Sequence, residues 1–474
     1  MSVQKENRFL FCTWLCLFLL LLFLRLNETD AGAPADGKGS LSGGTDSLLT
    51  GETGTEEPDI GQSEKREGQQ VIRVLLTDSS QSGYYHSEAV LTPAGRVRVS
   101  GTDLWLAPGE TVTFTADDQR FSEGKITLEP EDPGAGIALN SVSRGGKTPV
   151  YEGSLEIYQT EQGLYLVNAV ELETYLKYVV PSEMPASYET EALKAQAVCA
   201  RTYACRAMEE NALAQYHAQV DDSVSFQVYN GIGRQPAADQ AVDETRGQIM
   251  TWGGEPITAY FFSTSCGYTS TSEVWGQGNS EEYLKSVYLG SDAPENVQTE
   301  EVFASFIAQK DPDDFEAEDS WYRWKATLPA AVLDSRLEPY GIGTLQEMTV
   351  RRRSSGGAVT ELLLTGSSGS AVLENEYDIR EFLSVKGIPV TKNDGTSTTE
   401  MGLLPSAYFI CSSVYEGSLL TGFEILGGGY GHGVGMSQNG ARHLAQQGYS
   451  WQEILRYIYK DITLEQDENI RQTA

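Results

Sequence analysis

Residues 180–185, with the sequence VPSEMP, place one acidic side chain between two prolines. Pro181 lacks an amide hydrogen and tends to end a helix before it, while Pro185 pushes Met184 toward an extended conformation. Glu183 is therefore predicted to lie on a stiff elbow between two helices. A carboxylate that transfers protons needs such a fixed position. A solvated loop glutamate is the simpler interpretation of these residues alone.

Helical patterns flank the elbow on both sides. The first helix is expected to end at Pro181, and its apolar positions are Val170, Leu172, Leu176 and Val179. The second helix is expected to be capped by Ser187 and to run to about Glu210. Its apolar face consists of Leu193, Ala197, Ala200 and Ala204. Small residues at helical spacing let a neighbour approach closely, so this helix is predicted to be central and buried.

The rest of the chain favours a mixed architecture. Short alternating apolar runs begin at Val71, and the chain contains 48 glycines and 24 tyrosines among 474 residues. We therefore expect an α+β protein with short β-strands around a central helix pair and two or more lobes. The net charge of −33 disfavours nucleic acid as a partner, because phosphate binding needs positive charge. The basic run at residues 351–353 is interpreted as a solvated strand end.

The N-terminus predicts attachment to a membrane. Residues 9–24 are an apolar run without charge, preceded by Lys5 and Arg8. We favour an uncleaved anchor over residues 1–26, with the bulk of the chain outside the cell membrane. A cleaved signal peptide, which would make the protein secreted, is the alternative.

Three further segments complete the expected organisation. Residues 27–70 are rich in Gly, Ser, Thr, Asp and Glu and are predicted to be a disordered, acidic linker. Residues 71–465 are expected to form the functional domain, and residues 466–474 a C-terminal tail. Four cysteines lie beyond the apolar run, namely Cys199, Cys205, Cys266 and Cys411. They form no C-x-x-C pair, so one disulfide is possible but its members are not specified.

Two downstream blocks suggest ligand chemistry. Residues 262–269 (FSTSCGYT) form a hydroxyl-rich turn, and residues 273–276 (EVWG) place Trp275 after it. Sugar sites combine an aromatic face with such donors, although core packing is the alternative for each aromatic. Residues 429–441 (GYGHGVGMSQNGA) surround His432 with glycines, which predicts a tight backbone with positive φ angles. A phosphate loop is disfavoured, because no Gly-Lys-Ser/Thr follows.

These blocks together resemble the stage II sporulation protein D (SpoIID) family, which includes amidase-enhancer domains. The resemblance rests on VPSEMP, on EALKAQAVCARTY at residues 191–203, and on the two downstream blocks, all in the family's order. It extends over about residues 70–465.

The resemblance implies a lytic transglycosylase that cleaves peptidoglycan glycan strands in a groove between lobes. Family members act on strands stripped of stem peptides, at the sporulation septum during engulfment, anchored in the membrane and in complex with an amidase. Glu183 matches the family's catalytic glutamate. The residues that fall in motifs lining the groove are Arg201, Tyr203, Ser263, Tyr268, His432 and Gln438.

The expected mechanism uses Glu183 alone. An ordinary glycosidase uses two carboxylates, whereas a lytic transglycosylase can use the sugar's own 6-hydroxyl as nucleophile and gives a 1,6-anhydro product. To act first as an acid, Glu183 needs a pKa raised by burial beside Met184 and aromatics. The alternatives are a glycan-binding amidase enhancer that does not cut, and an envelope protein that only docks partners.

Two departures from the family pattern stand out. Some members bind zinc through His and Cys in the region of residues 217–229. Here residues 221–227 (DDSVSFQ) contain neither residue type, so no structural zinc and no cofactor are predicted. Cys266 stands where glycine is more usual, and the sequence offers no reason for it.

Overall fold

The structure is a computed structural model that describes residues 70–121, 123–276 and 281–467. The predicted anchor, the linker up to residue 69 and most of the predicted tail lie outside the described residues. Within the described ranges, none of the helices has the length and apolar character needed to span a bilayer. The described residues form an α+β fold with several sheets and eight α-helices.

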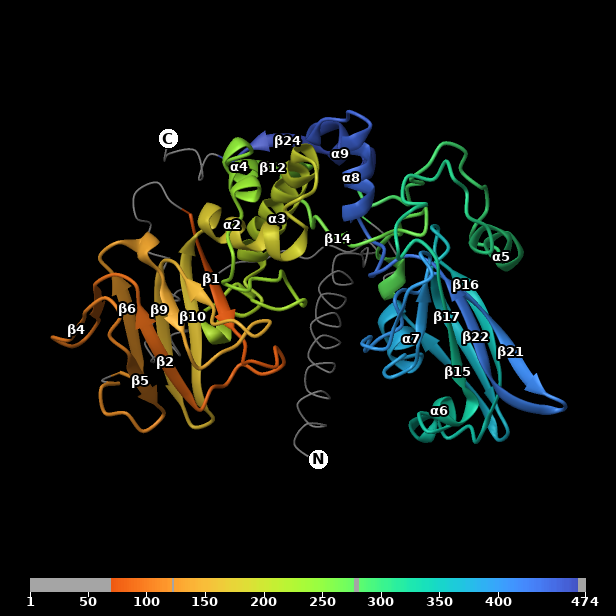
Figure 1. Cartoon of the computed structure of the whole chain (residues 1–474), viewed down its shortest axis with the longest axis horizontal. Coiled ribbons are helices and arrows are strands. Elements are labelled where there is room, and N and C mark those ends of the chain that lie inside the picture. The colour runs from red at the N-terminus through yellow and green to blue at the C-terminus, as the bar shows by residue number, and fades with distance from the viewer. Residues whose placement is uncertain (1–69, 122, 277–280, 468–474) are drawn as a thin grey trace, which may run out of the picture. The chain divides into compact units, whose positions relative to one another are not determined.

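The first half of the fold is built on a seven-stranded sheet (Figure 1). Its strands, in spatial order, are β11 (Val220–Asp221), β1 (Val71–Leu76), β10 (Gly163–Glu171), β9 (Ser154–Thr160), β6 (Lys125–Pro130), β3 (Val97–Val99) and β4 (Trp105–Leu106). A four-stranded sheet accompanies it, in the order β5 (Val112–Thr115), β2 (Glu88–Pro93), β7 (Ile137–Leu139) and β8 (Val150–Tyr151). The strands β9 and β10 pair as an antiparallel hairpin, and α2 follows β10 directly.

The helix α3 (Thr190–Glu210) lies at the centre of the helical layer. It contacts α2 (Leu172–Glu183), α4 (Pro236–Glu244), α8 (Gln438–Gln446) and α9 (Trp451–Ile458), and Figure 1 shows it beside α2 and α4. Its predicted small-residue face is confirmed, since Ala197, Ala200 and Ala204 are fully buried. Close approach of four helices is what that face permits.

Two predicted helix ends were wrong. The first helix continues through Pro181 to Glu183, and the amide of Met184 still bonds to the carbonyl of Val180 at 2.9 Å. Proline removes one hydrogen bond of the preceding turn, and packing of the helix compensates for that loss. The N-cap of α3 is Glu189, with φ −57° and ψ 142° and no side-chain hydrogen bond to the helix, instead of Ser187.

A second hydrophobic core lies in residues 324–425. A five-stranded sheet surrounds it in the order β20 (Ser397–Thr398), β19 (Val390–Lys392), β15 (Trp324–Pro329), β22 (Leu419–Gly427) and β21 (Phe409–Glu416). A three-stranded sheet joins it, formed by β16 (Leu345–Arg353), β17 (Val359–Gly366) and β18 (Gly369–Glu374). The helices of this half are α5 (Glu300–Ile307), α6 (Ala330–Asp334) and α7 (Glu376–Phe382).

The solvated interpretation of the basic run is wrong for one of its residues. The side chain of Arg353 is only 1% exposed, lies 2.6 Å from Glu300 and donates to the carbonyl of Phe409 at 2.9 Å. Arg351 and Arg352 are exposed on β16.

Short strands connect the central motifs. The strands β12 (Gln248–Trp252), β13 (Glu255–Pro256) and β24 (Thr463–Gln466) form one small sheet. The strands β14 (Phe261–Phe262) and β23 (Met436–Ser437) pair in parallel. This last pairing lays the hydroxyl-rich block directly beside the glycine-rich block.

Candidate active site

Glu183 is the last residue of α2 and is partly buried. Its Oε1 accepts a 2.7 Å hydrogen bond from the amide of Val228, and the adjacent Met184 is 1% exposed. Burial raises the pKa of Glu183 to about 7, although the hydrogen bond from Val228 acts in the opposite direction. The carboxyl group therefore carries its proton in a large fraction of molecules near neutral pH, and the expected rise in its pKa is confirmed.

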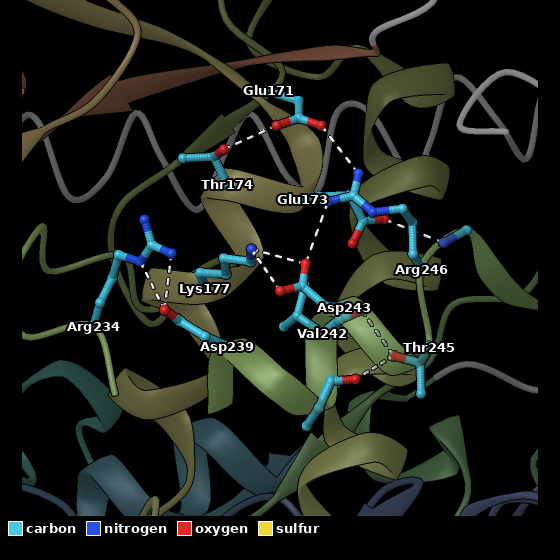
Figure 2. Close-up of polar contacts among 12 residues, drawn as sticks. Glu171, Glu173, Thr174, Lys177, Arg234, Asp239, Val242, Asp243, Thr245 and Arg246 are labelled. Carbon is cyan, nitrogen blue, oxygen red and sulfur yellow. Dashed lines mark hydrogen bonds and ion pairs between the residues drawn. The ribbon is translucent and has the colours of Figure 1, made fainter. Parts of the chain in front are cut away.

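Ion pairs fasten α2, which carries Glu183, to the neighbouring segment (Figure 2). The ammonium of Lys177 lies 2.8 Å from Asp243, and the guanidinium of Arg246 lies 3.2 Å from Glu171. Asp243 belongs to α4, and Arg246 follows that helix. Ion pairs therefore hold both Glu171, the residue before α2, and Lys177 within α2, so the position of Glu183 depends on these contacts as well as on the elbow.

Arg201 lies inside this support and is 0% exposed. Its Nε and Nη2 each donate to the carboxylate of Glu173 at 2.7 Å. Its remaining donors reach the carbonyls of Val242 and Gln248, both at 3.2 Å. The prediction that Arg201 lines a groove is corrected here, because every direction from its guanidinium meets protein; its contacts tie α3 to α2 and to the segment after α4.

A chain of aromatic side chains links α3 to the two downstream blocks. The ring of Tyr203 lies 6.2 Å from that of Tyr260, which lies 4.8 Å from Trp275. The ring of Trp275 in turn lies 5.4 Å from His432. Glu183 belongs to the electrostatic surroundings of Tyr203. The fold thus connects Tyr203, Trp275 and His432 through neighbouring rings, and Tyr203 lies within electrostatic range of Glu183.

His432 is fixed as a neutral ring. Its Nδ1 accepts from the amide of Val434 at 3.1 Å, and its Nε2 lies 3.0 Å from the carbonyl of Phe261, to which only an Nε2–H can donate. Burial of the ring lowers its pKa to about 4. With both nitrogens occupied, His432 orients its aromatic neighbours and does not carry protons in this arrangement.

The other predicted residues are dispersed. Ser263 is partly exposed, next to the glycine-rich block. Tyr268 is 9% exposed and donates to the carbonyl of Pro294 at 2.6 Å, so it packs away from the aromatic chain. Gln438 is 8% exposed, begins α8 and lies 3.5 Å from Gln196 of α3. Of the predicted residues, only Tyr203 and His432 take part in the aromatic chain near Glu183.

Comparison with known proteins gives the family. The model of the stage II sporulation protein (SpoIID) family matches residues 160–252, and a domain of unknown function, DUF8618, matches residues 269–435. An uncharacterised protein of Brachyspira hyodysenteriae is 30% identical over 346 residues, which are 73% of this chain and 77% of that protein. Stage II sporulation protein D of Bacillus subtilis is 28% identical over 72% of this chain and 87% of its own. The chain belongs to the SpoIID family.

One further relative carries a different name. The amidase enhancer of Bacillus subtilis is 28% identical over 61% of this chain, but the match spans only 40% of that protein. The SpoIID match contains Glu183 and Tyr203, whereas His432 lies in the second matched region. The aromatic chain therefore joins both matched regions of this SpoIID-family protein.

Two important residues were missed from the sequence. Val228 contributes its backbone amide, which no side-chain pattern marks. Glu316 is fully buried and accepts hydrogen bonds from the amide of Ser265 at 3.0 Å, from the hydroxyl of Ser437 at 2.6 Å and from the hydroxyl of Ser265. Glu316 lies outside every motif block, so only the fold reveals that it joins two of them.

The cysteines and possible metal ligands of the described residues form neither a disulfide nor a metal site. No group of three or more His, Cys, Asp or Glu residues is arranged to hold a metal ion among the residues that the structure describes. Each of Cys199, Cys205, Cys266 and Cys411 is a free thiol. Cys266 is fully buried against Gly428.

Proposed function

We propose that this protein is a lytic transglycosylase that cleaves peptide-stripped peptidoglycan glycan strands with Glu183 as its single acid and base. Membership of the SpoIID family supports a role at the cell wall in sporulation. The observation that carries the chemistry is the carboxyl of Glu183, held by one amide and with a pKa of about 7. General acids work best when their pKa lies near the working pH.

Glu183 first donates its proton to the glycosidic oxygen as the bond to C1 of the muramic acid residue breaks. The resulting carboxylate then removes the proton from the 6-hydroxyl of that sugar, whose oxygen attacks C1. The products are a strand with a new non-reducing end and a strand with a 1,6-anhydro end, and Glu183 regains its proton. No water and no second carboxylate enter this sequence, which distinguishes it from ordinary hydrolysis.

Two buried acidic residues that share a tyrosine neighbour with Glu183 support this single-carboxylate scheme. Asp221 accepts the hydroxyl of Tyr84 at 2.8 Å, and Asp222 lies 2.7 Å from Arg144. Both are at most 1% exposed. Because both carboxylates are buried and already bonded to other side chains, neither is available as the nucleophile or the water-activating base of a two-carboxylate glycosidase.

The test is digestion of purified, peptide-free glycan strands followed by mass spectrometry. The full-length protein should release fragments with 1,6-anhydromuramic ends. The Glu183→Gln variant should lose at least about 100-fold of this activity, the usual contribution of a general acid, and still bind strands. Glu244→Gln, at the exposed end of α4, is the matched control. Cleavage by Glu183→Gln at the rate of the unchanged protein would refute the assignment.

A second candidate function is a glycan-binding enhancer of a cell-wall amidase. The relative named amidase enhancer favours it, and the residues of the sequence motifs would serve either role. Under this alternative, the protein binds strands and leaves them uncut, while it increases the rate of an added amidase. In both cases we propose an N-terminal membrane anchor, an extracytoplasmic domain, and a partner amidase of the sporulation machinery.

A further inference from the structure

The loop at residues 221–229, which we call the 221–229 loop, supplies the amide that holds Glu183. It begins in β11, and residues at both ends of the loop make buried polar contacts. Its tip is open, because Val224 is 89% exposed. The loop contains no His or Cys, so contacts of its own residues must fix the direction of the Val228 amide.

The first anchor is Asp222. Its Oδ2 lies 2.7 Å from Nη2 of Arg144, and its Oδ1 accepts from the amide and the hydroxyl of Thr77 at 2.9 and 2.6 Å. The side chains of Arg144 and Asp222 are 2% and 0% exposed. Arg144 also donates to the carbonyls of Thr77 and Asp78, so the pair locks the loop to the chain that follows β1.

The second anchor is Asp221, which shapes the turn itself. Its Oδ2 accepts the hydroxyl of Tyr84 at 2.8 Å, and its Oδ1 accepts the amide and the hydroxyl of Ser223 at 2.9 and 2.8 Å. An aspartate that bonds the amide two residues later closes a tight turn.

The third anchor consists of Gln227 and Tyr229, the two residues that flank Val228. Gln227 accepts the hydroxyl of Tyr175 from α2 and donates to the carbonyl of Ala200 in α3, both at 3.2 Å. Tyr229 donates to the side-chain oxygen of Asn168 at 2.9 Å. Both flanking residues are fully buried. The peptide plane between Gln227 and Val228 therefore has little freedom to turn.

The surroundings of Glu183 make this one amide decisive. The titratable groups near it are Tyr175 on α2 and Tyr203 on α3. Asp221 of the loop acts on both tyrosines, Asp222 acts on Tyr175, and Glu210 of α3 acts on Tyr203. The hydrogen bond from Val228 is the one that the described structure gives the Glu183 carboxyl. Because Oε1 is occupied as an acceptor, the acid proton resides on Oε2, the oxygen left free for a ligand.

We propose that the 221–229 loop is a preorganised cradle that selects the reactive oxygen of Glu183, with Arg144 and Asp222 as positioning residues that act through the Val228 amide. The inference rests on the proposed role of Glu183 as the acid. It assigns to a buried ion pair, without contact to substrate, the alignment of the proton donor. Preorganisation of this kind costs nothing at the moment of reaction.

The test compares the full-length protein with Arg144→Met and with Asp222→Asn, which keeps the shape of the side chain. Arg353→Met is the matched control, because the side chain of Arg353 is equally buried and pairs with Glu300 of α5. The titration of Glu183 is followed by carboxyl ¹³C NMR, with its signal assigned by its loss in Glu183→Gln. The pH dependence of strand cleavage is measured in parallel.

Loss of a hydrogen bond to the ionised form raises the pKa of a carboxyl group. We expect the titration midpoint of Glu183 to rise by about one pH unit in Arg144→Met and Asp222→Asn, and to stay unchanged in Arg353→Met. The fall in cleavage at alkaline pH should move upward by the same amount. A purely structural role would lower activity equally at every pH and leave the midpoint in place.

An unchanged midpoint in either loop variant, with native near-ultraviolet circular dichroism, overturns the inference. If the unchanged protein leaves strands intact while the midpoint moves in the variants, the cradle stands and the proposed function fails. If the protein cuts strands and the midpoint does not move, the cradle alone fails.

Discussion

The hydroxyl of Ser437 donates a 2.6 Å hydrogen bond to Oε1 of Glu316, a carboxylate with no solvent exposure. The same oxygen accepts the amide of Ser265 at 3.0 Å. The oxygen of the Ser437 hydroxyl also caps α8 by accepting the amide of Gly440 at 3.2 Å. One buried side chain therefore ties the hydroxyl-rich block to the start of the helix that follows the glycine-rich block.

Replacement of Ser437 by alanine should destabilise the protein by about 2 kcal/mol. The variant loses a helix cap, worth about 1 kcal/mol, and leaves a buried carboxylate oxygen without one of its donors. Ser450→Ala is the control, since Ser450 caps α9 through an exposed capping box. It should cost about 1 kcal/mol or less. Urea unfolding measures both, and equal losses would contradict the role assigned to Glu316.

The pair of Glu173 and Arg201 makes a separate prediction. Arg201→Met should destabilise the fold by about 3–5 kcal/mol, because it leaves the buried Glu173 carboxylate without its partner. The double variant Glu173→Met with Arg201→Met should recover most of that stability. Since Arg201 faces only protein, the folded double variant should bind glycan strands as the unchanged protein does in a co-sedimentation assay. Loss of binding in the folded double variant would mean that Arg201 contacts the glycan strand.

Local pattern predicted the elements well where one interaction dominates. The helix α3 ends at Glu210 as its apolar spacing indicated, and the strand β1 begins at Val71, where the alternating runs begin in the sequence. Pro181 misled the prediction of the end of α2, because a proline costs one hydrogen bond and the packed helix tolerates that loss. Propensity rules do not weigh such tertiary contacts.

The residues of the candidate site also divide into those that the sequence marks and those that only the fold reveals. Glu183 stands out in the sequence because prolines restrict the backbone around it, and His432 because the glycines around it permit positive φ angles. Val228 could not be found, since any residue except proline provides an amide. Glu316 contacts Ser265 from 51 positions away, so its importance depends on how the whole chain folds.

His432 predicts how the protein responds to acid. Its pKa is about 4 in the folded protein, below the ordinary value of 6.5. Between these values the unfolded chain binds a proton that the folded protein does not, so stability falls as pH falls from about 6.5 to about 4. The contribution is up to about 3 kcal/mol. His432→Asn, which keeps an acceptor for the amide of Val434, should lose this dependence in unfolding measurements at pH 4.5 and 7. The same acid dependence in both proteins would contradict the buried, neutral ring.

Glu183 predicts a dependence of the opposite sign. Its pKa is about 7 when folded against an ordinary value of 4.5, so between these values the folded protein keeps a proton that the unfolded chain has released. Stability contributed by this group is present below pH 4.5 and is lost as pH rises to about 7.

Glu183→Gln should therefore be more stable than the unchanged protein at pH 8, by up to about 3 kcal/mol, and about equally stable at pH 4.5. Glutamine fills the same space and still accepts the amide of Val228, so the two proteins differ mainly in the buried charge. Urea unfolding at both pH values measures the difference. A Gln variant that is less stable at pH 8 would mean that the carboxylate is stabilised where it lies, and a group of that kind would be a poor general acid.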